Sequence, residues 1–157
     1  MKRTDWLPLI GFIALSQLAG VVGSFFTVSS VNTWYNTLVH PALNPPSWVF
    51  GPVWTTLYIL MGVAAFLVWK QGKGARKRRA LIVFGLQLSP NALWSVVFFG
   101  LQWPLGGVVV IAAMWLSIVW TMVLFNNISR QSARLLWPYL AWVTFASYLN
   151  VAIWLLN

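Results

Sequence analysis

Five long apolar stretches constrain the fold of this chain more than any other feature of its sequence. Each is close to the roughly 20 residues that an α-helix needs to span a bilayer. None contains Lys, Arg, Asp or Glu, apart from Arg134 at the edge of the last one. Because helices that are apolar on every side have no face to offer water, the sequence predicts an all-α membrane protein. We expect a bundle of five transmembrane helices that forms a single domain over 1–157, with spans at about 6–27, 48–69, 80–100, 105–126 and 134–156.

The first stretch has one feature of a secretory signal peptide, since Lys2 and Arg3 precede it. Its apolar run is about 20 residues long, whereas the apolar core of a signal peptide is usually about 7–15. We therefore expect a retained helix.

The few ionisable side chains exclude several kinds of chemistry. Of the 157 residues 7% are charged, Asp5 is the only acid, and there is one His and no Cys. Disulfides, thiol catalysis, structural zinc and iron–sulfur clusters are excluded. A carboxylate pair for glycoside hydrolysis and an intramembrane acid for proton relay are excluded as well. We expect no required cofactor and no metal site.

The basic residues occur in three segments outside the apolar stretches. Lys2 and Arg3 precede the first span, six cations lie within 70–79, and Arg130 and Arg134 precede the fifth span. With five spans, all three segments fall on one side of the membrane. Because cytoplasmic loops are rich in Lys and Arg, the N terminus and the basic loop 70–79 are predicted to be cytoplasmic and the C terminus outside.

The basic run 70–79 has two interpretations. Its charge suggests nucleic-acid binding, but no aromatic side chain is interleaved on which bases could stack. A topology signal that also touches anionic lipid headgroups explains the run. We expect the lipid bilayer as a partner and no nucleic acid.

The long connection 28–47 is predicted to be a lid over the outer ends of the helices. Its prolines prevent a long helix, and Trp34, Tyr35 and Leu43 make it too apolar for a solvated linker. His40 is either a polar loop residue or an axial haem ligand. The prolines are Pro41, Pro45 and Pro46.

Aromatic and amide side chains share helical faces in the outer half of three spans. At about 1.5 Å per residue, these faces lie roughly 9 Å below the outer ends of their helices. This arrangement predicts an apolar, aromatic ligand pocket beneath the lid, with a few amide dipoles to orient a ligand. The residues are Trp54 and Tyr58, Asn91 and Trp94, and Trp142, Ala146 and Asn150.

Plainer interpretations of these residues stay open. Amides on membrane helices often hold helices together, so Asn91 and Asn150 are either such links or ligand contacts. Small residues at four-residue spacing, Ser16, Gly20 and Ser24, mark a close helix contact on the first span. That contact is either within the chain or between two copies.

Several motifs along the chain resemble those of the tryptophan-rich sensory protein family (TspO/MBR), whose animal members are the translocator protein or peripheral benzodiazepine receptor. The resemblance covers nearly the whole chain, and its Pro-Pro-x-Trp-x-x-Gly-Pro-Val-Trp block is long and specific. The motifs are Trp34-Tyr35, Asn44-Pro45-Pro46-Ser47-Trp48-Val49-Phe50-Gly51-Pro52-Val53-Trp54, Asn91-Ala92-Leu93-Trp94, Trp137-Pro138-Tyr139-Leu140-Ala141-Trp142 and Leu149-Asn150.

The resemblance implies a five-helix bundle, usually a homodimer, that binds porphyrins and haem, sterols in some members, and synthetic apolar drugs. It implies a receptor or carrier for tetrapyrroles. The alternatives are an enzyme that promotes light-dependent degradation of protoporphyrin and a ligand-regulated stress-sensing partner protein. Carried onto this sequence, the pocket residues are Tyr35, Pro45, Pro46, Trp54, Tyr58, Asn91, Trp94, Trp142, Ala146 and Asn150.

The sequence departs from the family pattern in three places. His40-Pro41-Ala42-Leu43 stands where the family often has Lys-Pro-x-Trp. Pro90, directly before Asn91, is expected to bend the third helix near the pocket. The C-terminal segment 150–157 lacks the basic residue of the animal cholesterol motif, so sterol binding by that route is not expected.

Overall fold

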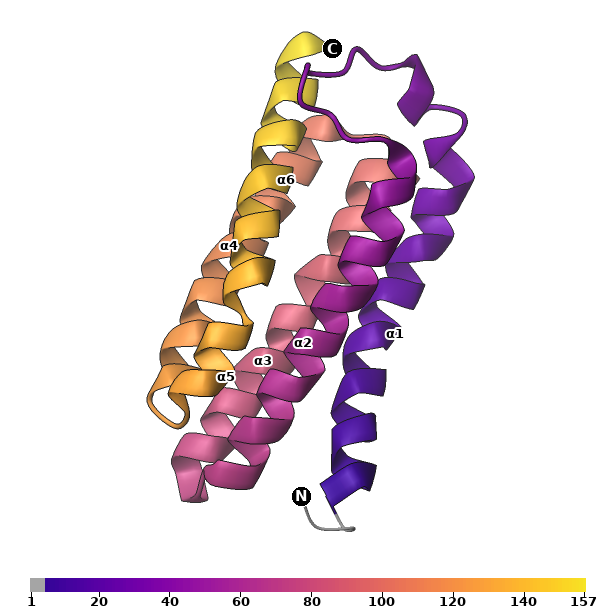
Figure 1. The fold of residues 1–157 in the computed structure, drawn as a ribbon. Helices are drawn as coiled ribbons and strands as arrows, with labels where there is room; N and C mark the ends of the chain where they lie inside the picture. The colour runs from indigo at the N-terminus through magenta and orange to yellow at the C-terminus, as the bar shows by residue number, and fades with distance from the viewer. Residues whose placement is uncertain (1–4) are drawn as a thin grey trace.

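The computed structural model describes residues 5–157 and contains five helical segments long and apolar enough to cross a membrane. They stand side by side as an elongated bundle, with the long loop and the C-terminus at one end (Figure 1). We call this the loop end, and the opposite end the basic end. No strand occurs within residues 5–157, which confirms the predicted fold class. The helices are α1 (Trp6–Val31), α2 (Phe50–Gln71), α3 (Gly74–Ser95), α4 (Pro104–Asn126), α5 (Arg130–Leu135) and α6 (Trp137–Leu156).

The connection between α2 and α3 is much shorter than the predicted loop 70–79, and this prediction was wrong. Only Gly72 and Lys73 separate the two helices, and Gly74 starts α3 with a positive φ of 56°. Ala, Arg and Lys are good helix formers, so the basic run continues the apolar span as its first turns rather than forming a loop. The sharp turn itself depends on Gly74, because glycine adopts a positive φ without a steric penalty.

The connection between α3 and α4 is a tight hairpin, which fits the short gap between the predicted spans 80–100 and 105–126. The end of α3 continues into a π-helical segment, η4 (Val96–Gly100), and three residues then lead to Pro104. Gln102 has a φ of 50°, and the Trp103 N–H donates to the Val97 carbonyl at 3.2 Å. Pro104 suits the first turn of α4, where its missing N–H would have no partner in the helix.

The fifth span begins earlier than predicted and is divided into α5 and α6 at Leu136. Ser129 caps α5 by accepting a hydrogen bond from the Ser132 N–H at 3.4 Å. The division follows from Pro138, which has no N–H to donate to the Arg134 carbonyl. Pro90 does not divide its helix in this way, because α3 is continuous from Gly74 to Ser95.

The core of the bundle is formed by α2, α3, α4 and α6, while α1 lies at its edge. Met61, Phe84, Ile118 and Tyr139 are each at most 1% exposed. Among the residues of α1 only Ser16, Gly23 and Ser30 are buried. The exposed apolar surface that remains suits contact with lipid tails.

Glycines bring α1 close to its neighbours within the chain. A Cβ on Gly62 of α2 would lie 2.5 Å from the Ile13 Cα, and a Cβ on Gly23 would lie 2.8 Å from the Ser95 Oγ. Gly20 faces the Tyr58 ring in the same way. Gly20, which the four-residue spacing singled out, and Gly23 therefore serve contacts of α1 with α2 and α3.

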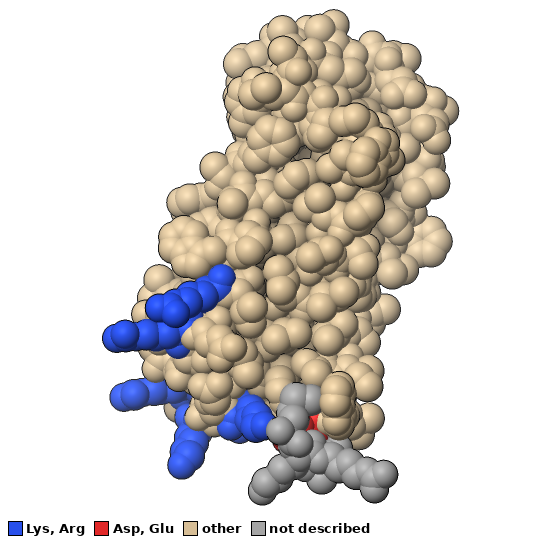
Figure 2. Space-filling model, viewed as in Figure 1, with Lys and Arg blue, Asp and Glu red and all other residues tan. Residues whose placement is uncertain are grey.

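All the described Lys and Arg side chains belong to the basic end. They lie in 70–79 and 130–134, and Figure 2 shows them in the lower part of the visible face, with none in its upper part. Lys70 Nζ donates to Asp5 Oδ2 at 2.6 Å. Lys2 and Arg3 lie outside the described residues. The asymmetry is present in the fold, and the side of the membrane to which it corresponds stays a prediction.

The loop end is covered by residues 32–46, which include the short helix η2 (Tyr35–Thr37) and lead into η3 (Ser47–Val49). Tyr35 packs on Phe99 of η4 at 5.6 Å between ring centroids, and its hydroxyl donates to Asn44 Oδ1 at 3.1 Å. The Val39 N–H donates to Asn157 Oδ1 at 2.9 Å, and Asn157 Nδ2 donates back to the Val39 carbonyl at 3.1 Å. These contacts attach the loop to the ends of α3 and α6.

Candidate functional site

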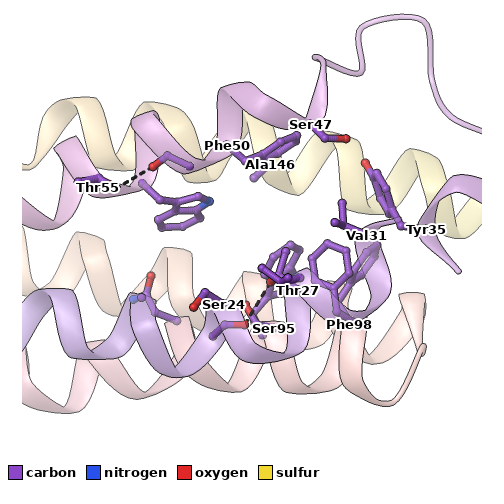
Figure 3. A pocket seen from close by; sticks show the side chains of 18 of the residues that line it. Ser24, Thr27, Val31, Tyr35, Ser47, Phe50, Thr55, Ser95, Phe98 and Ala146 are labelled. Carbon is purple, nitrogen blue, oxygen red and sulfur yellow. Dashed lines mark hydrogen bonds between the residues drawn. The ribbon is translucent and has the colours of Figure 1, made fainter. Parts of the chain in front are cut away.

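A cavity of about 510 Å3 lies in the loop half of the bundle, enclosed by α1, α2, α3, η4, α6 and the loop. Its volume is within the range of pockets that hold small organic ligands. Figure 3 shows Ser24 and Thr27 of α1 on one side of it and Phe50 on the other. No lining residue is charged. The residues that line the cavity are Gln17, Gly20, Val21, Gly23, Ser24, Thr27, Val28, Val31, Tyr35, Ser47, Trp48, Phe50, Gly51, Trp54, Thr55, Tyr58, Asn91, Trp94, Ser95, Phe98, Phe99, Ala146, Leu149, Asn150 and Ile153.

The wall formed by α1 is apolar in effect although it carries hydroxyl groups. Ser24 Oγ donates to the Val21 carbonyl at 2.7 Å, and Thr27 Oγ1 donates to the Gly23 carbonyl at 3.2 Å. A hydroxyl that bonds to its own helix in this way has its donor already used. The wall therefore favours contact with hydrocarbon or aromatic surface.

The wall formed by α2 presents an aromatic stack. The Trp54 and Tyr58 rings lie 5.6 Å apart at an interplanar angle of 27°. Trp54 also meets the Tyr139 ring edge to face at 6.3 Å. The Trp54 indole N–H has no hydrogen-bond partner among the residues 5–157 that are described, so it is free to donate to a ligand.

The polar group of α3 belongs to a network that reaches into the core. Asn91 Nδ2 donates to the Tyr139 hydroxyl oxygen at 2.8 Å and to the Gln87 carbonyl at 3.3 Å. Gln87 Nε2 donates to the same hydroxyl at 2.6 Å, and the Tyr58 hydroxyl lies 3.5 Å from Asn91 Oδ1. The Tyr139 and Tyr58 hydroxyls and the Gln87 carbonyl thus hold the Asn91 amide in one orientation beside the cavity.

A second aromatic stack lies where α3 passes into η4. The Trp94 and Phe98 rings are 5.1 Å apart at an interplanar angle of 15°. Trp94 Nε1 donates to Asn150 Oδ1 at 2.8 Å, and Asn150 Nδ2 donates to the Pro104 carbonyl at 3.0 Å. Asn150 therefore links three helices and orients Trp94, which is the linking role that sequence analysis left open for it.

The loop contributes Tyr35, which is only 6% exposed. Burial raises the pKa of the Tyr35 phenol, and its hydrogen bond with Asn44 lowers the pKa by less. The phenol is therefore neutral at physiological pH and presents no charge to the pocket.

The structure brings seven of the ten residues predicted for the site to the cavity and places three elsewhere. Trp142 packs against Phe50 at 5.8 Å between ring centroids, and its buried Nε1 has no partner among residues 5–157. Pro45 and Pro46 lie in the loop before η3, where the Pro46 carbonyl accepts from the Val49 N–H at 3.0 Å. The seven are Tyr35, Trp54, Tyr58, Asn91, Trp94, Ala146 and Asn150.

His40 does not line the cavity. Its ring lies 4.5 Å from the Tyr35 ring, on the loop. Residues 5–157 hold no group of three or more His, Cys, Asp or Glu side chains that could bind a metal ion. His40 therefore lies outside the lining of the pocket, and its role as a haem ligand stays a prediction.

Sequence reasoning missed the contribution of α1 and η4 to the pocket. Gly20, Gly23 and Ser24 line it, although their spacing indicated only a helix contact. These residues have both roles. The absence of large side chains brings α1 close to Tyr58 and Ser95 and leaves room for the cavity beside them. Phe98 and Phe99, near the end of the third span, also line the cavity, but helical periodicity did not assign them to it.

Comparison with known proteins agrees with the motifs. The sequence profile of the TspO/MBR family matches residues 12–155. The chain is 45% identical over 151 residues to a tryptophan-rich protein TspO of Archaeoglobus fulgidus, covering 96% of this chain and 97% of that one. It is 46% identical over 154 residues to a protein of the same name from Chlorobaculum tepidum, covering 96% of each.

An animal protein is also similar over nearly its full length. The human translocator protein is 38% identical over 155 residues, which cover 95% of this chain and 89% of the human one. The family profile and these identities extend over the helices, the loop and the cavity described above. The chain is thus an integral, multi-pass membrane protein and belongs to the TspO/MBR family.

Proposed function

We propose that the protein is a membrane receptor or carrier that binds porphyrins, haem and similar flat apolar ligands in the pocket under the first loop. The observation that best supports this proposal is an uncharged cavity of about 510 Å3 whose walls hold two aromatic stacks, Trp54 on Tyr58 and Trp94 on Phe98. Flat conjugated rings pack well on such side chains. The name of the human relative, translocator protein, is consistent with a carrier.

The polar groups of the pocket suit a ligand that carries hydrogen-bond acceptors. The Trp54 N–H is free to donate, whereas the Asn91 and Asn150 amides are held by Tyr139 and Trp94. A ligand that accepts a hydrogen bond from Trp54 gains orientation without disturbing the core. A few fixed polar contacts in an apolar cavity are the usual basis of specificity in such sites.

The absence of a cation among the lining residues limits where a porphyrin can place its carboxylates. An unpaired carboxylate inside an apolar cavity is costly. The propionates must therefore point to water at the loop end while the ring enters the cavity. We expect protoporphyrin dimethyl ester to bind at least as tightly as the diacid, and uroporphyrin, with carboxylates on every side of its ring, to bind at least about tenfold more weakly.

The first test is a titration of the purified protein with protoporphyrin in the dark, followed by tryptophan fluorescence. Saturable quenching that weakens in both Trp54→Phe and Asn91→Ala is the expected result. Trp103→Phe is the matched control, because Trp103 is 54% exposed and does not line the cavity. Quenching that never saturates, or that is equal in all variants, would show nonspecific partitioning and overturn the proposal.

Transport of the ligand across the membrane is tested separately from binding. Vesicles that contain the protein should take up or release protoporphyrin faster than protein-free vesicles of the same lipid composition. Equal rates would show that the protein does not carry protoporphyrin across the membrane, and the proposal would then be limited to a receptor.

We also propose that the protein acts as a homodimer in the bilayer. It needs no resident cofactor, because the porphyrin or haem is its ligand. Cross-linking in lipid nanodiscs tests the dimer.

The second candidate function is light-dependent degradation of protoporphyrin. It is favoured by Trp54, whose indole lines the cavity with a free N–H, because indoles are oxidisable groups that would lie against the bound ring. Illumination of the complex in air separates the two functions. Porphyrin loss faster than in a control protein of equal tryptophan content, and slowed by Trp54→Phe, would support the enzyme, whereas equal bleaching would leave only binding.

A further inference from the structure

A second cavity lies at the basic end, between the first turns of α3 and the turn that joins α4 to α5. Its volume is about 440 Å3, and its lining shares no residue with the pocket described above. It belongs to the part of the molecule where the cations gather (Figure 2). It is lined by Arg76, Arg79, Leu124, Asn127 and Ile128.

The two arginines of this cavity have no acidic partner within the chain. Arg76 and Arg79 are three residues apart on α3 and so lie on one face of the helix. Within residues 5–157, neither makes a hydrogen bond or an ion pair with another side chain. Asp5, the only acid of the chain, bonds to Lys70. Both arginines are exposed, so their guanidinium groups are accessible to an anion from outside the protein.

The other side of the cavity is a fixed turn. The Ile128 and Ser129 N–H groups donate to the Phe125 carbonyl at 2.9 and 2.7 Å. Gly72 packs against this turn, since a Cβ there would lie 3.3 Å from the Ile128 Cγ2. The Asn127 side-chain amide has no hydrogen-bond partner among the described residues. The turn thus holds a free amide donor in the cavity that Arg76 and Arg79 line.

This combination of groups matches a phosphate attached to apolar chains. Guanidinium forks and amide N–H groups bond to phosphate oxygens with charge-assisted geometry. Leu124 and Ile128 supply apolar surface in the same cavity. A zwitterionic headgroup would bring an ammonium group among the six cations of 70–79, so an anionic headgroup is favoured.

We propose that this cavity binds the phosphate group of an anionic phospholipid, with Arg76 and Arg79 as its ionic partners and Asn127 as a further donor. The proposed site lies between α3 and the α4–α5 turn and takes one headgroup. It is therefore a more specific feature than a diffuse attraction of the basic end to the membrane surface.

The test is native mass spectrometry of the full chain in detergent, titrated with phosphatidylglycerol and, separately, with phosphatidylcholine. We expect one phosphatidylglycerol per protomer to bind about tenfold more tightly than phosphatidylcholine. Arg76→Gln/Arg79→Gln should lower phosphatidylglycerol affinity by about tenfold. The matched control is Lys73→Gln/Arg78→Gln, which removes the same charge from exposed positions outside the cavity and should change the affinity by less than about twofold.

Three outcomes would overturn the proposal. Equal losses in the two double variants would show that only net charge matters, and no loss in either would show that lipid binds elsewhere. Competition by glycerol phosphate or inorganic phosphate at concentrations equal to the lipid would identify a soluble phosphate as the ligand. Asn127→Ala, which leaves the charge and the helices intact, provides a further expected loss should the arginine variant fail to fold as judged by circular dichroism.

Discussion

Tyr139 is the residue on which the polar side chains of the bundle core converge. It is 0% exposed, and its hydroxyl oxygen accepts hydrogen bonds from Gln87 Nε2 at 2.6 Å and Asn91 Nδ2 at 2.8 Å. Tyr139→Phe removes this acceptor and leaves both amides with a buried, unused N–H. We expect a loss of about 1–3 kcal/mol in the free energy of unfolding, together with weaker protoporphyrin binding because Asn91 is no longer held. Thermal unfolding in detergent and fluorescence quenching measure the two effects.

Tyr148→Phe is the control for this change. Tyr148 lies on the same helix, is 47% exposed and makes no side-chain hydrogen bond among residues 5–157. Removal of its hydroxyl should alter neither stability nor binding measurably. Equal effects of the two substitutions would show that the network around Tyr139 contributes nothing to the site.

The inward face of α6 shows how far the sequence alone could specify the site. Residues that are three or four positions apart lie on the same face of a helix. Trp142, Ala146 and Asn150 are four residues apart, so the sequence predicted that they share the face toward the pocket. In the structure the Trp142 ring packs against Phe50. The buried positions of α6 are Tyr139, Val143, Ala146, Leu149, Asn150 and Ile153. Sequence spacing placed Ala146 and Asn150 on the face that lines the cavity, but it could not choose between two neighbouring faces that are both apolar.

At the scale of the helices, the contact of α1 with α2 depends on Gly62. A Cβ there would lie 2.5 Å from the Ile13 Cα and 2.7 Å from the Ile13 N, which are backbone atoms and cannot move aside by a side-chain rotation. Gly62→Ala should therefore push α1 outward and destabilise the protein by about 1–3 kcal/mol. Because α1 is also a wall of the pocket, affinity for protoporphyrin should fall in parallel.

Gly85→Ala is the comparison within α3. A Cβ at Gly85 meets no atom within 4 Å. In a helix interior Ala is favoured over Gly by roughly 0.5–1 kcal/mol, so this variant should be as stable as the wild type or slightly more so. Thermal unfolding of the two variants side by side provides the measurement, and destabilisation of the same size in both would contradict the close approach of α1.

The loop is fastened to α6 by a pair of side-chain to backbone bonds. Asn157 accepts from the Val39 N–H at 2.9 Å and donates to the Val39 carbonyl at 3.1 Å. Asn157→Ala removes both bonds, each worth about 1 kcal/mol net, so hydrogen exchange of the Val39 amide should accelerate at least about fivefold. Asn36→Ala, at an exposed loop position without a side-chain bond in the described structure, should leave the exchange unchanged. An unchanged rate in both would mean that other contacts hold the loop.

The element boundaries were predictable where a special residue marks them and uncertain where only composition changes. Pro104 marks the start of α4, close to the predicted 105, whereas the division of the fifth span before Pro138 was not predicted. The start of α3 was misplaced because the basic run differs from the span in polarity but not in helix propensity. The residue at which a helix begins need not be the residue at which it enters the membrane. The positions of Lys and Arg indicate the membrane boundary and not the start of the helix.

At the scale of the molecule, the two candidate binding sites lie at opposite ends and differ in chemistry. The pocket under the loop has no charged lining residue, whereas the cavity at the basic end is lined by Arg76 and Arg79. This separation follows from the sequence, since two spans lie between each basic segment and the next, and an even number of spans returns the chain to the same end. The order of the spans and the pocket beneath the loop were therefore predictable from the chain, while the contribution of α1 to that pocket and the cavity at the basic end depend on packing that only the three-dimensional structure gives.

The same charge separation predicts how the protein is inserted. Because Lys and Arg favour the cytoplasmic side, the basic end should be cytoplasmic and the pocket should face the outside of the cell or the lumen. The chain has no Cys, so single cysteines can be labelled without background. Asn36→Cys in the loop should react with a membrane-impermeant maleimide in intact cells, whereas Gln71→Cys, at the end of α2, should react only after permeabilisation.

Both positions are exposed, and neither substitution alters the ten cations that direct insertion. The reverse labelling pattern would place the pocket on the cytoplasmic side, and a carrier would then load its ligand from the cytoplasm. Labelling of both cysteines in intact cells would show insertion in two orientations. That result would contradict an orientation fixed by charge, because the end opposite the basic segments offers no Lys or Arg that competes for the cytoplasmic side.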